Sequence, residues 1–266
     1  MSACGMGTWR MGDDPGQRAE EIATLQLGLD LGTTLIDTAE MYGEGRAEEL
    51  VGEAIQDRRD RAFVVSKVYP HNASRKGMVA ACERSLRRLR TDHLDLYLLH
   101  WRGDVPLAET VEAFGVLQKA GKIRHFGVSN LDLADMDELW SVSGGEGVAT
   151  NQLLYNLTRR GIELDLLPWL RQHGVPVMAY SPIEQAQLIR DPKLIEFSRR
   201  HDLTPTQAAL GWLLAAGDVI VIPKTSSPER LKVNLAAREH ALTAEQRAAL
   251  DSLFPKPATP RPLEML

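Results

Sequence analysis

The chain has 266 residues, 44% of them hydrophobic, and a formal net charge of −5, so it can bury one large core and lacks the basic surface that a nucleic-acid partner would require. Two cysteines, Cys4 and Cys82, are too few for a disulfide framework, and no His or Cys spacing is typical of a metal site. The N-terminal residues lack a secretory signal pattern and no apolar run reaches the roughly 18 residues of a membrane span, so we expect a cytoplasmic protein with no membrane partner.

Short apolar runs rich in β-branched residues predict eight strands, at 3–7, 34–37, 62–67, 94–99, 123–128, 148–151, 175–180 and 218–222. The runs are nearly continuous in apolar residues, as expected for a parallel sheet that is covered on both faces. Stretches with a single apolar stripe, such as 74–90 and 106–120, predict helices between them. Gly32 and Gly121 follow such stretches, where a left-handed helix end needs no Cβ.

Strands therefore alternate with helices along the whole chain without a linker. This pattern predicts an α/β protein, a (β/α)8 or TIM barrel that spans residues 1–266 as a single domain, rather than a doubly wound sheet. Residues 254–266 contain four prolines and are expected to form a short extended C-terminal tail.

Polar side chains stand at or just after the ends of seven of the predicted strands. Active sites of such barrels lie at the carboxyl ends of the strands, which all meet at one rim. We therefore expect a functional site built from Asp37, Lys67, His100, Ser129, Gln152, Tyr180 and Lys224.

Asp37, Lys67 and His100, with Tyr42 on the loop after Asp37, are the candidate catalytic group. An unpaired ammonium after the apolar FVVS segment would be costly, and Asp37 is the natural partner of Lys67. A nearby ammonium lowers the pKa of a tyrosine, and a histidine beside it can orient a carbonyl oxygen. Taken singly, each residue also has an ordinary structural explanation, but together they suit the reduction of an aldehyde or ketone.

A reduction needs a hydride donor, and the sequence has no Rossmann fingerprint, because GMGTW (5–9) lacks the third glycine and the acidic ribose ligand. Glycine there is better explained by close backbone approach, and we expect the barrel rim to hold the cofactor. Residues 224–227 precede Pro228, which suits a first helical turn, and the positive helix N-terminus favours phosphate. Arg230 and Asn234 share one face of that helix.

The chain resembles the aldo-keto reductase family over essentially its whole length. The segments that carry the resemblance are GMGTW (5–9), LIDTAEMYGEG (35–45), VVSKV (64–68), LDLYLLHW (94–101), GKIRHFGVSN (121–130), NQLLYN (151–156), AYSP (179–182) and IPKTSSPERLKVN (222–234). The segments GTWRMGDDP, LDLYLLHW and RGIELDLLPW further resemble a bacterial branch that includes methylglyoxal reductases.

The resemblance implies that Tyr42 is the general acid, that Lys67 lowers its pKa and that Asp37 positions Lys67. It implies that His100, as a neutral imidazole, orients the substrate carbonyl oxygen. The substrate would contact His100 and the two apolar walls that Trp9 and Trp101 form.

The resemblance also implies NADPH (NADP+) as cofactor and no metal. Ser129, Asn130 and Gln152 would hold the nicotinamide carboxamide, and Tyr180 would stack on its ring. Lys224, Ser226 and Arg230 would hold the 2′-phosphate, and Asn234 the adenine. An arginine binds a phosphate through two hydrogen bonds, which favours NADPH over NADH. The full set of implied cofactor residues is Gly7, Thr8, Trp9, Asp37, Ser129, Asn130, Gln152, Tyr180, Ser181, Ile183, Lys224, Thr225, Ser226, Arg230 and Asn234.

Several positions depart from the family pattern. Thr225 stands where the family often has serine, and Val233 replaces an acidic or amide residue that helps to hold adenine. The loop after AYSP is short, which suggests fast cofactor release. The chain begins almost at the first strand, so the barrel floor is expected to be less well covered, and the short tail is expected to leave the substrate mouth open.

Two other functions remain open at this point. The chain could bind NADPH as an accessory or regulatory barrel with little turnover, or it could use Lys67 as a Schiff-base nucleophile, although a carboxylate beside it would hold the lysine protonated. The sequence does not identify the physiological carbonyl substrate. No exposed apolar seam is evident, so we expect a monomer.

Overall fold

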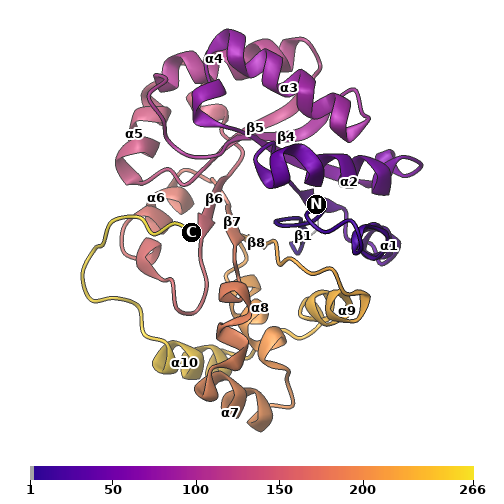
Figure 1. Cartoon of the computed structure of the whole chain (residues 1–266). Helices are drawn as coiled ribbons and strands as arrows, with labels where there is room; N and C mark the ends of the chain where they lie inside the picture. The colour runs from indigo at the N-terminus through magenta and orange to yellow at the C-terminus, as the bar shows by residue number, and fades with distance from the viewer. Residues whose placement is uncertain (1–2) are drawn as a thin grey trace.

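A computed structural model describes residues 3–266, and within them eight parallel strands follow one another around a single sheet in chain order. The strands are β1 (Met6–Gly7), β2 (Leu35–Asp37), β3 (Phe63–Val68), β4 (Leu94–Leu99), β5 (Ile123–Ser129), β6 (Asn151–Leu154), β7 (Val177–Tyr180) and β8 (Val219–Val221). Parallel bridges from Cys4 to Val221 and from Gly7 to Lys224 join the first strand region to the last and close the sheet. The predicted (β/α)8 barrel is confirmed (Figure 1).

The closing seam explains the glycine in β1. The Gly7 amide donates a hydrogen bond of 3.1 Å to the Pro223 carbonyl oxygen. A Cβ at position 7 would lie 2.8 Å from the carbonyl oxygen of Ile222, closer than real Cβ atoms approach an oxygen. Glycine is therefore needed here for the two ends of the sheet to meet.

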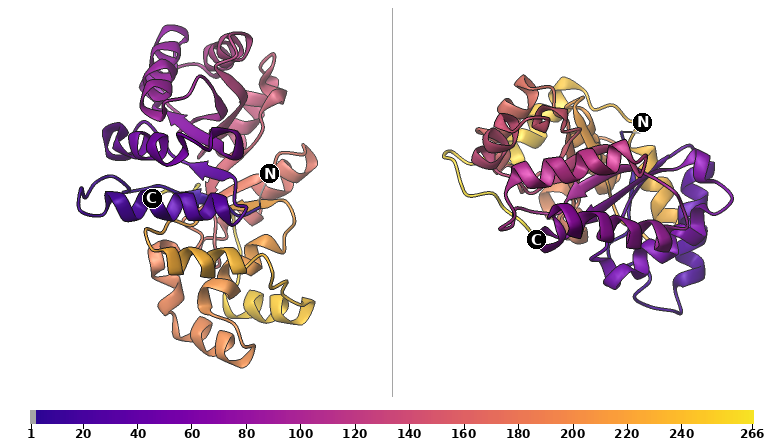
Figure 2. Two further views of the ribbon diagram at one scale, coloured as in Figure 1. Left: turned by 90° about the vertical axis from the view of Figure 1, so that its right-hand side faces the viewer. Right: turned by 90° about the horizontal axis from the view of Figure 1, so that it is seen from above.

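Helices surround the strands, as Figure 2 shows from two further directions. They are α1 (Arg18–Asp30), α2 (Arg46–Ile55), α3 (Arg75–Leu89), α4 (Leu107–Lys119), α5 (Leu133–Ser141), α6 (Leu166–Gln172), α7 (Pro192–Arg200), α8 (Pro205–Leu214), α9 (Pro228–Ala236) and α10 (Ala244–Leu253). The helices expected over 74–90 and 106–120 are α3 and α4, and Gly32 and Gly121 have φ of +82° and +69°, as their places after helices predicted. Among residues 3–266, none of the helices is both long and apolar enough to cross a membrane.

The barrel interior holds a separate apolar cluster, made of Leu35, Val65, Leu96, Leu98, Met178, Ile220 and Ile222. Side chains alternate between the two faces of a strand, so the next inward position after each of these residues lies two residues further along the chain. After Leu35 that position is Asp37, after Val65 it is Lys67, and after Leu98 it is His100. The apolar interior therefore ends in a polar layer at the carboxyl rim.

The sixth strand lies later in the chain than predicted. The sequence favoured 148–151, whereas β6 spans Asn151–Leu154. Ala149 and Thr150 do bond to β5, but pairing with β7 begins only at Asn151. Gln152 consequently lies inside β6, opposite Ser129, and not after its end. Both VATN and NQLL are apolar enough to form a strand, so only the partner strands decide the register.

Candidate active site

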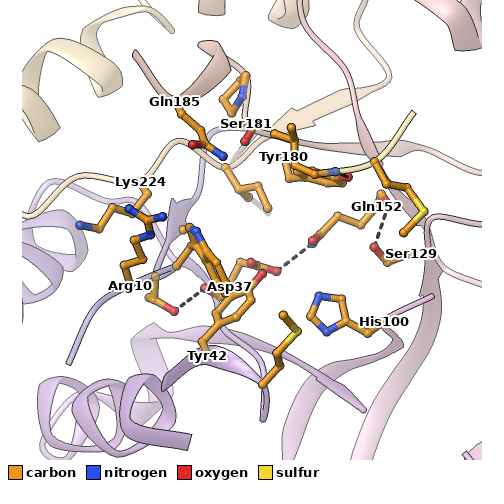
Figure 3. A pocket seen from close by; sticks show the side chains of 18 of the residues that line it. Arg10, Asp37, Tyr42, His100, Ser129, Gln152, Tyr180, Ser181, Gln185 and Lys224 are labelled. Carbon is orange, nitrogen blue, oxygen red and sulfur yellow. Dashed lines mark hydrogen bonds between the residues drawn. The ribbon is translucent and has the colours of Figure 1, made fainter. Parts of the chain in front are cut away.

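A cavity of about 420 Å³ opens at the carboxyl ends of the strands (Figure 3). It brings together most of the side chains that the sequence singled out from distant segments. The predicted residues that line it are Gly7, Thr8, Trp9, Asp37, Tyr42, His100, Trp101, Ser129, Asn130, Gln152, Tyr180, Ser181, Ile183 and Lys224.

Lys67 lies beneath the cavity and organises its floor. Its ammonium is fully buried and donates to the Asp37 carboxylate at 2.8 Å, the Thr38 carbonyl at 2.8 Å and the Tyr42 hydroxyl at 3.0 Å. Asp37 is itself 2% exposed, and its second carboxylate oxygen accepts a 2.8 Å hydrogen bond from Gln152. Both charges of the buried pair are thus compensated, as burial requires.

The two pKa shifts follow from this arrangement. Burial alone would lower the pKa of Lys67, but Asp37 and Tyr42 outweigh it and raise the pKa, so the lysine stays charged. Burial raises the pKa of Tyr42, and the Lys67 charge opposes that rise without cancelling it. Lys67 therefore acts on the pKa of Tyr42 in the predicted direction, but desolvation of the phenol is the larger effect.

His100 follows β4 and faces Tyr42, with 5.8 Å between the ring centroids. Burial, and secondly the nearby Lys67 charge, lower the pKa of His100 to about 2. The imidazole is therefore neutral at physiological pH, as predicted. Its Nδ1 is buried and has no hydrogen-bond partner among residues 3–266.

Aromatic rings flank this group. The Trp9 ring packs edge-on against Tyr42 with centroids 4.9 Å apart, and the Trp101 ring lies 4.8 Å from that of His100. Trp9 is 40% exposed, which is unusual for a core tryptophan and is consistent with a cavity wall.

Ser129, Asn130, Gln152 and Tyr180 form a connected polar wall. The Asn130 side chain donates to the His100 carbonyl at 3.2 Å and to the Ser129 hydroxyl at 3.1 Å, and it accepts from the Tyr180 hydroxyl at 3.1 Å. Ser129 donates to the Gln152 carbonyl oxygen at 2.9 Å. Asn130 adopts φ of +55°, a left-handed conformation that asparagine tolerates and that turns its amide into this network.

The segment after β8 begins α9 as the sequence predicted. Ser227 caps the helix and Pro228 is its first residue. Lys224 donates to the Ser226 hydroxyl at 2.8 Å and lies beside Arg10 in Figure 3. Four predicted cofactor residues do not line the cavity and lie further along this segment or on α9: Thr225, Ser226, Arg230 and Asn234.

Sequence reasoning missed eight lining residues, which are Arg10, Met41, Pro182, Gln185, Ala186, Ile222, Met265 and Leu266. Met41, Pro182 and Ile222 lie inside recognised motifs, and Arg10 directly follows one, so the available signal was position in or beside a motif. No sequence pattern identified Met265 and Leu266 as cavity residues.

Residues 254–266 have no helix or strand, as expected, but they run from α10 back to the mouth of the barrel (Figure 1). The tail therefore contributes Met265 and Leu266 to the cavity wall, which the sequence did not reveal.

Residues 3–254 match the aldo/keto reductase family. The chain is 48% identical to methylglyoxal reductase YeaE of Escherichia coli K12, over all of this chain and 95% of that protein. It is 31% identical to methylglyoxal reductase DkgB of Escherichia coli O157:H7, over 94% of this chain and 92% of that one.

Its structure is also similar to that of an aldo/keto reductase from Klebsiella pneumoniae in complex with NADP and acetate. The TM-score is 0.98 at 50% identity, covering all of this chain and 96% of the other. The barrel, the rim site and these similarities agree, and the chain belongs to the aldo/keto reductase family.

Proposed function

We propose that this protein reduces small aldehydes and ketones to alcohols with NADPH, and that 2-oxoaldehydes such as methylglyoxal are among its substrates. The observation that carries the proposal is the buried Asp37–Lys67–Tyr42 group facing one cavity with a neutral His100. Two relatives named methylglyoxal reductase and a related structure that holds NADP support the choice of substrate and cofactor.

The residues around the cavity fit the cofactor, which when bound supplies the hydride. Among residues 3–266, no side chain or amide donates to the Gln152 Oε1 atom, while its Nε2 is held by Asp37. We therefore assign Gln152 Oε1 to accept from the nicotinamide carboxamide, beside Ser129 and Asn130. Tyr180 would stack on the nicotinamide ring.

The phosphate end fits the segment before α9 and the helix itself. Lys224, Ser226 and Arg230 would bind the 2′-phosphate, with the positive N-terminus of α9 adding to their attraction. Asn234, on the same helix, would contact the adenine, and Thr225 would lie against the phosphate.

The proton steps follow from the protonation states. Tyr42 remains a neutral phenol at physiological pH, so it can donate its proton to the developing alkoxide. The Lys67 ammonium, 3.0 Å from the hydroxyl, then stabilises the phenolate. The neutral His100 holds the carbonyl oxygen toward Tyr42 by donating an N–H hydrogen bond. Trp9 and Trp101 exclude water from one side of the reacting carbon.

The same geometry argues against Lys67 as a Schiff-base nucleophile. Its ammonium donates to three acceptors and its pKa is raised, so the free amine needed for attack on a carbonyl is suppressed.

The test is a steady-state assay of NADPH oxidation with methylglyoxal, repeated with NADH and with larger carbonyls. We expect turnover that requires the carbonyl, with a higher kcat/KM for NADPH than for NADH. Tight NADPH binding without carbonyl-dependent oxidation across the panel would instead indicate an accessory, cofactor-sensing barrel.

A further inference from the structure

Two segments that are far apart in the sequence close the outer side of the cavity. One is the loop after β7, which contributes Ser181, Gln185 and Ala186, and the other is the end of the tail, which contributes Met265 and Leu266. The side chain of Gln185 points into the cavity in Figure 3.

The loop after β7 has a strained backbone. Ser181, Glu184, Gln185 and Ala186 all have positive φ, between 46° and 68°, although none is glycine. Such conformations are unfavourable for residues with a Cβ and persist only where surrounding contacts enforce them. Side-chain contacts with the rest of the protein must therefore hold this loop in its strained backbone conformation.

Those contacts converge on the Glu184 carboxylate. Arg159 donates two hydrogen bonds to its Oε1, of 2.7 and 3.0 Å, and Asn156 donates one of 2.7 Å to Oε2. Asn156 also donates to the Ser181 carbonyl at 2.9 Å. The Glu184 side chain is only 12% exposed, so water competes weakly for these bonds.

The tail is held by the same arginine. The Nη1 atom of Arg159 donates to the Glu264 carboxylate at 2.8 Å. Immediately beyond that anchor the backbone amide of Leu266 approaches the Tyr180 hydroxyl at 3.4 Å. One guanidinium therefore fixes both the strained loop and the two apolar side chains of the tail.

We propose that Arg159 is a positioning residue that couples the loop on the cofactor side to the wall on the substrate side, through Glu184 and Glu264. The inference rests on the function proposed above, because it assigns the loop to NADPH and Met265 and Leu266 to the carbonyl substrate. Loss of either carboxylate removes one of the two anchors of the guanidinium, so the guanidinium positions the other segment less firmly. Because the loop and the tail share Arg159, we expect a change in the tail to alter NADPH binding, and coupling between two binding sites is reciprocal.

Glu264→Gln is the decisive variant, because it removes the carboxylate charge that attracts Arg159 to the tail and replaces no residue of the loop. We expect NADPH to dissociate about three- to tenfold faster, measured by stopped-flow fluorescence, the scale of the net contribution of one ordinary hydrogen bond. The kcat/KM ratio of phenylglyoxal to methylglyoxal should rise by a similar factor, because the wall yields to the larger substrate.

Arg159→Met should produce both effects more strongly. Arg159→Lys should retain the wild-type behaviour only in part, since an ammonium lacks the planar fork that binds two carboxylates. Arg171→Met is the matched control. It breaks a comparable pair, with Nε 2.6 Å from Asp218, at the opposite end of the strands, and should leave both readouts unchanged.

If the loop and the tail were held independently of each other, the variants would change NADPH dissociation and substrate preference in a different pattern. If Glu264→Gln changes only substrate preference and leaves NADPH dissociation as in the wild type, the coupling is refuted. If Arg159→Met lowers Tm but changes neither readout, the arginine is merely structural. Absence of carbonyl-dependent NADPH oxidation in the wild type would instead refute the proposed function, so the two failures are distinguishable.

Discussion

Replacing Asp37 with asparagine separates the stability of the buried ion pair from its role in catalysis. The Lys67 ammonium has no exposed surface, and Asp37 is the only carboxylate among residues 3–266 that contacts it, at 2.8 Å. Asparagine preserves the shape of the side chain and removes its charge. The lysine is then left as a buried cation whose remaining acceptors are neutral.

The expected cost follows from that burial. Removing one partner of a buried ion pair costs about 3–5 kcal/mol, because the other charge loses its compensation. For a chain of this size such a loss lowers Tm by about 10 °C. Carbonyl reduction should also fall by about 10²-fold or more, because a lysine that sheds its proton no longer stabilises the Tyr42 phenolate.

The double variant Asp37→Asn/Lys67→Met tests whether the unpaired charge of Lys67 causes the loss of stability. Removing both charges eliminates the unpaired cation, so urea unfolding should show that stability recovers to near the wild-type value, while activity stays lost. An Asp37→Asn protein as stable as the wild type would refute the argument. So would a double variant less stable than Asp37→Asn, because the second substitution should relieve the penalty left by the first.

Three further outcomes follow from the site. The pKa of His100 lies near 2 when folded and near 6.5 when unfolded, so the unfolded chain binds more protons between these values and stability falls as the pH falls. His100→Gln removes that dependence: between pH 7 and pH 5 the wild type should lose about 2 kcal/mol more in urea unfolding than the variant, and equal losses would contradict the assignment. Arg230→Ala should weaken NADPH binding about 10- to 100-fold in fluorescence titrations while leaving NADH binding nearly unchanged, and an equal loss for both cofactors would place Arg230 away from the 2′-phosphate. Because the Tyr42 pKa is raised, carbonyl reduction should persist from pH 6 to about 9 and decline only as the phenol ionises, whereas a decline centred near pH 7 would assign the proton to another group.

The polar rim was predictable from sequence because it depends on strand periodicity. Asp37, Lys67 and His100 each continue an inward-facing row of apolar residues, so locating the strands located the site. The phosphate segment was predictable because Pro228 suits the first turn of a helix, where its missing N–H needs no partner. Gln152 was misplaced relative to its strand, since the register of β6 is decided by β7 and not by its own residues.

Long-range geometry accounts for what the sequence did not reveal. The tail reaches the cavity wall through contacts such as that of Arg159 with Glu264, which joins residues more than a hundred positions apart and which no local pattern encodes. The sequence did not reveal how strongly burial raises the pKa of Tyr42, for a related reason. A motif shows which charge is near the phenol, but only the packed structure shows how completely the phenol is desolvated.

The most direct test of the mechanism is the kcat/KM of Tyr42→Phe for methylglyoxal with NADPH, measured together with NADPH binding by fluorescence. The phenol contributes only a proton and one hydrogen bond to Lys67, so its loss should lower kcat/KM by about 10²–10⁴ and leave the NADPH Kd unchanged. Turnover near the wild-type rate would show that Tyr42 is not the general acid, and the role assigned to the whole Asp37–Lys67–Tyr42 group would fail with it.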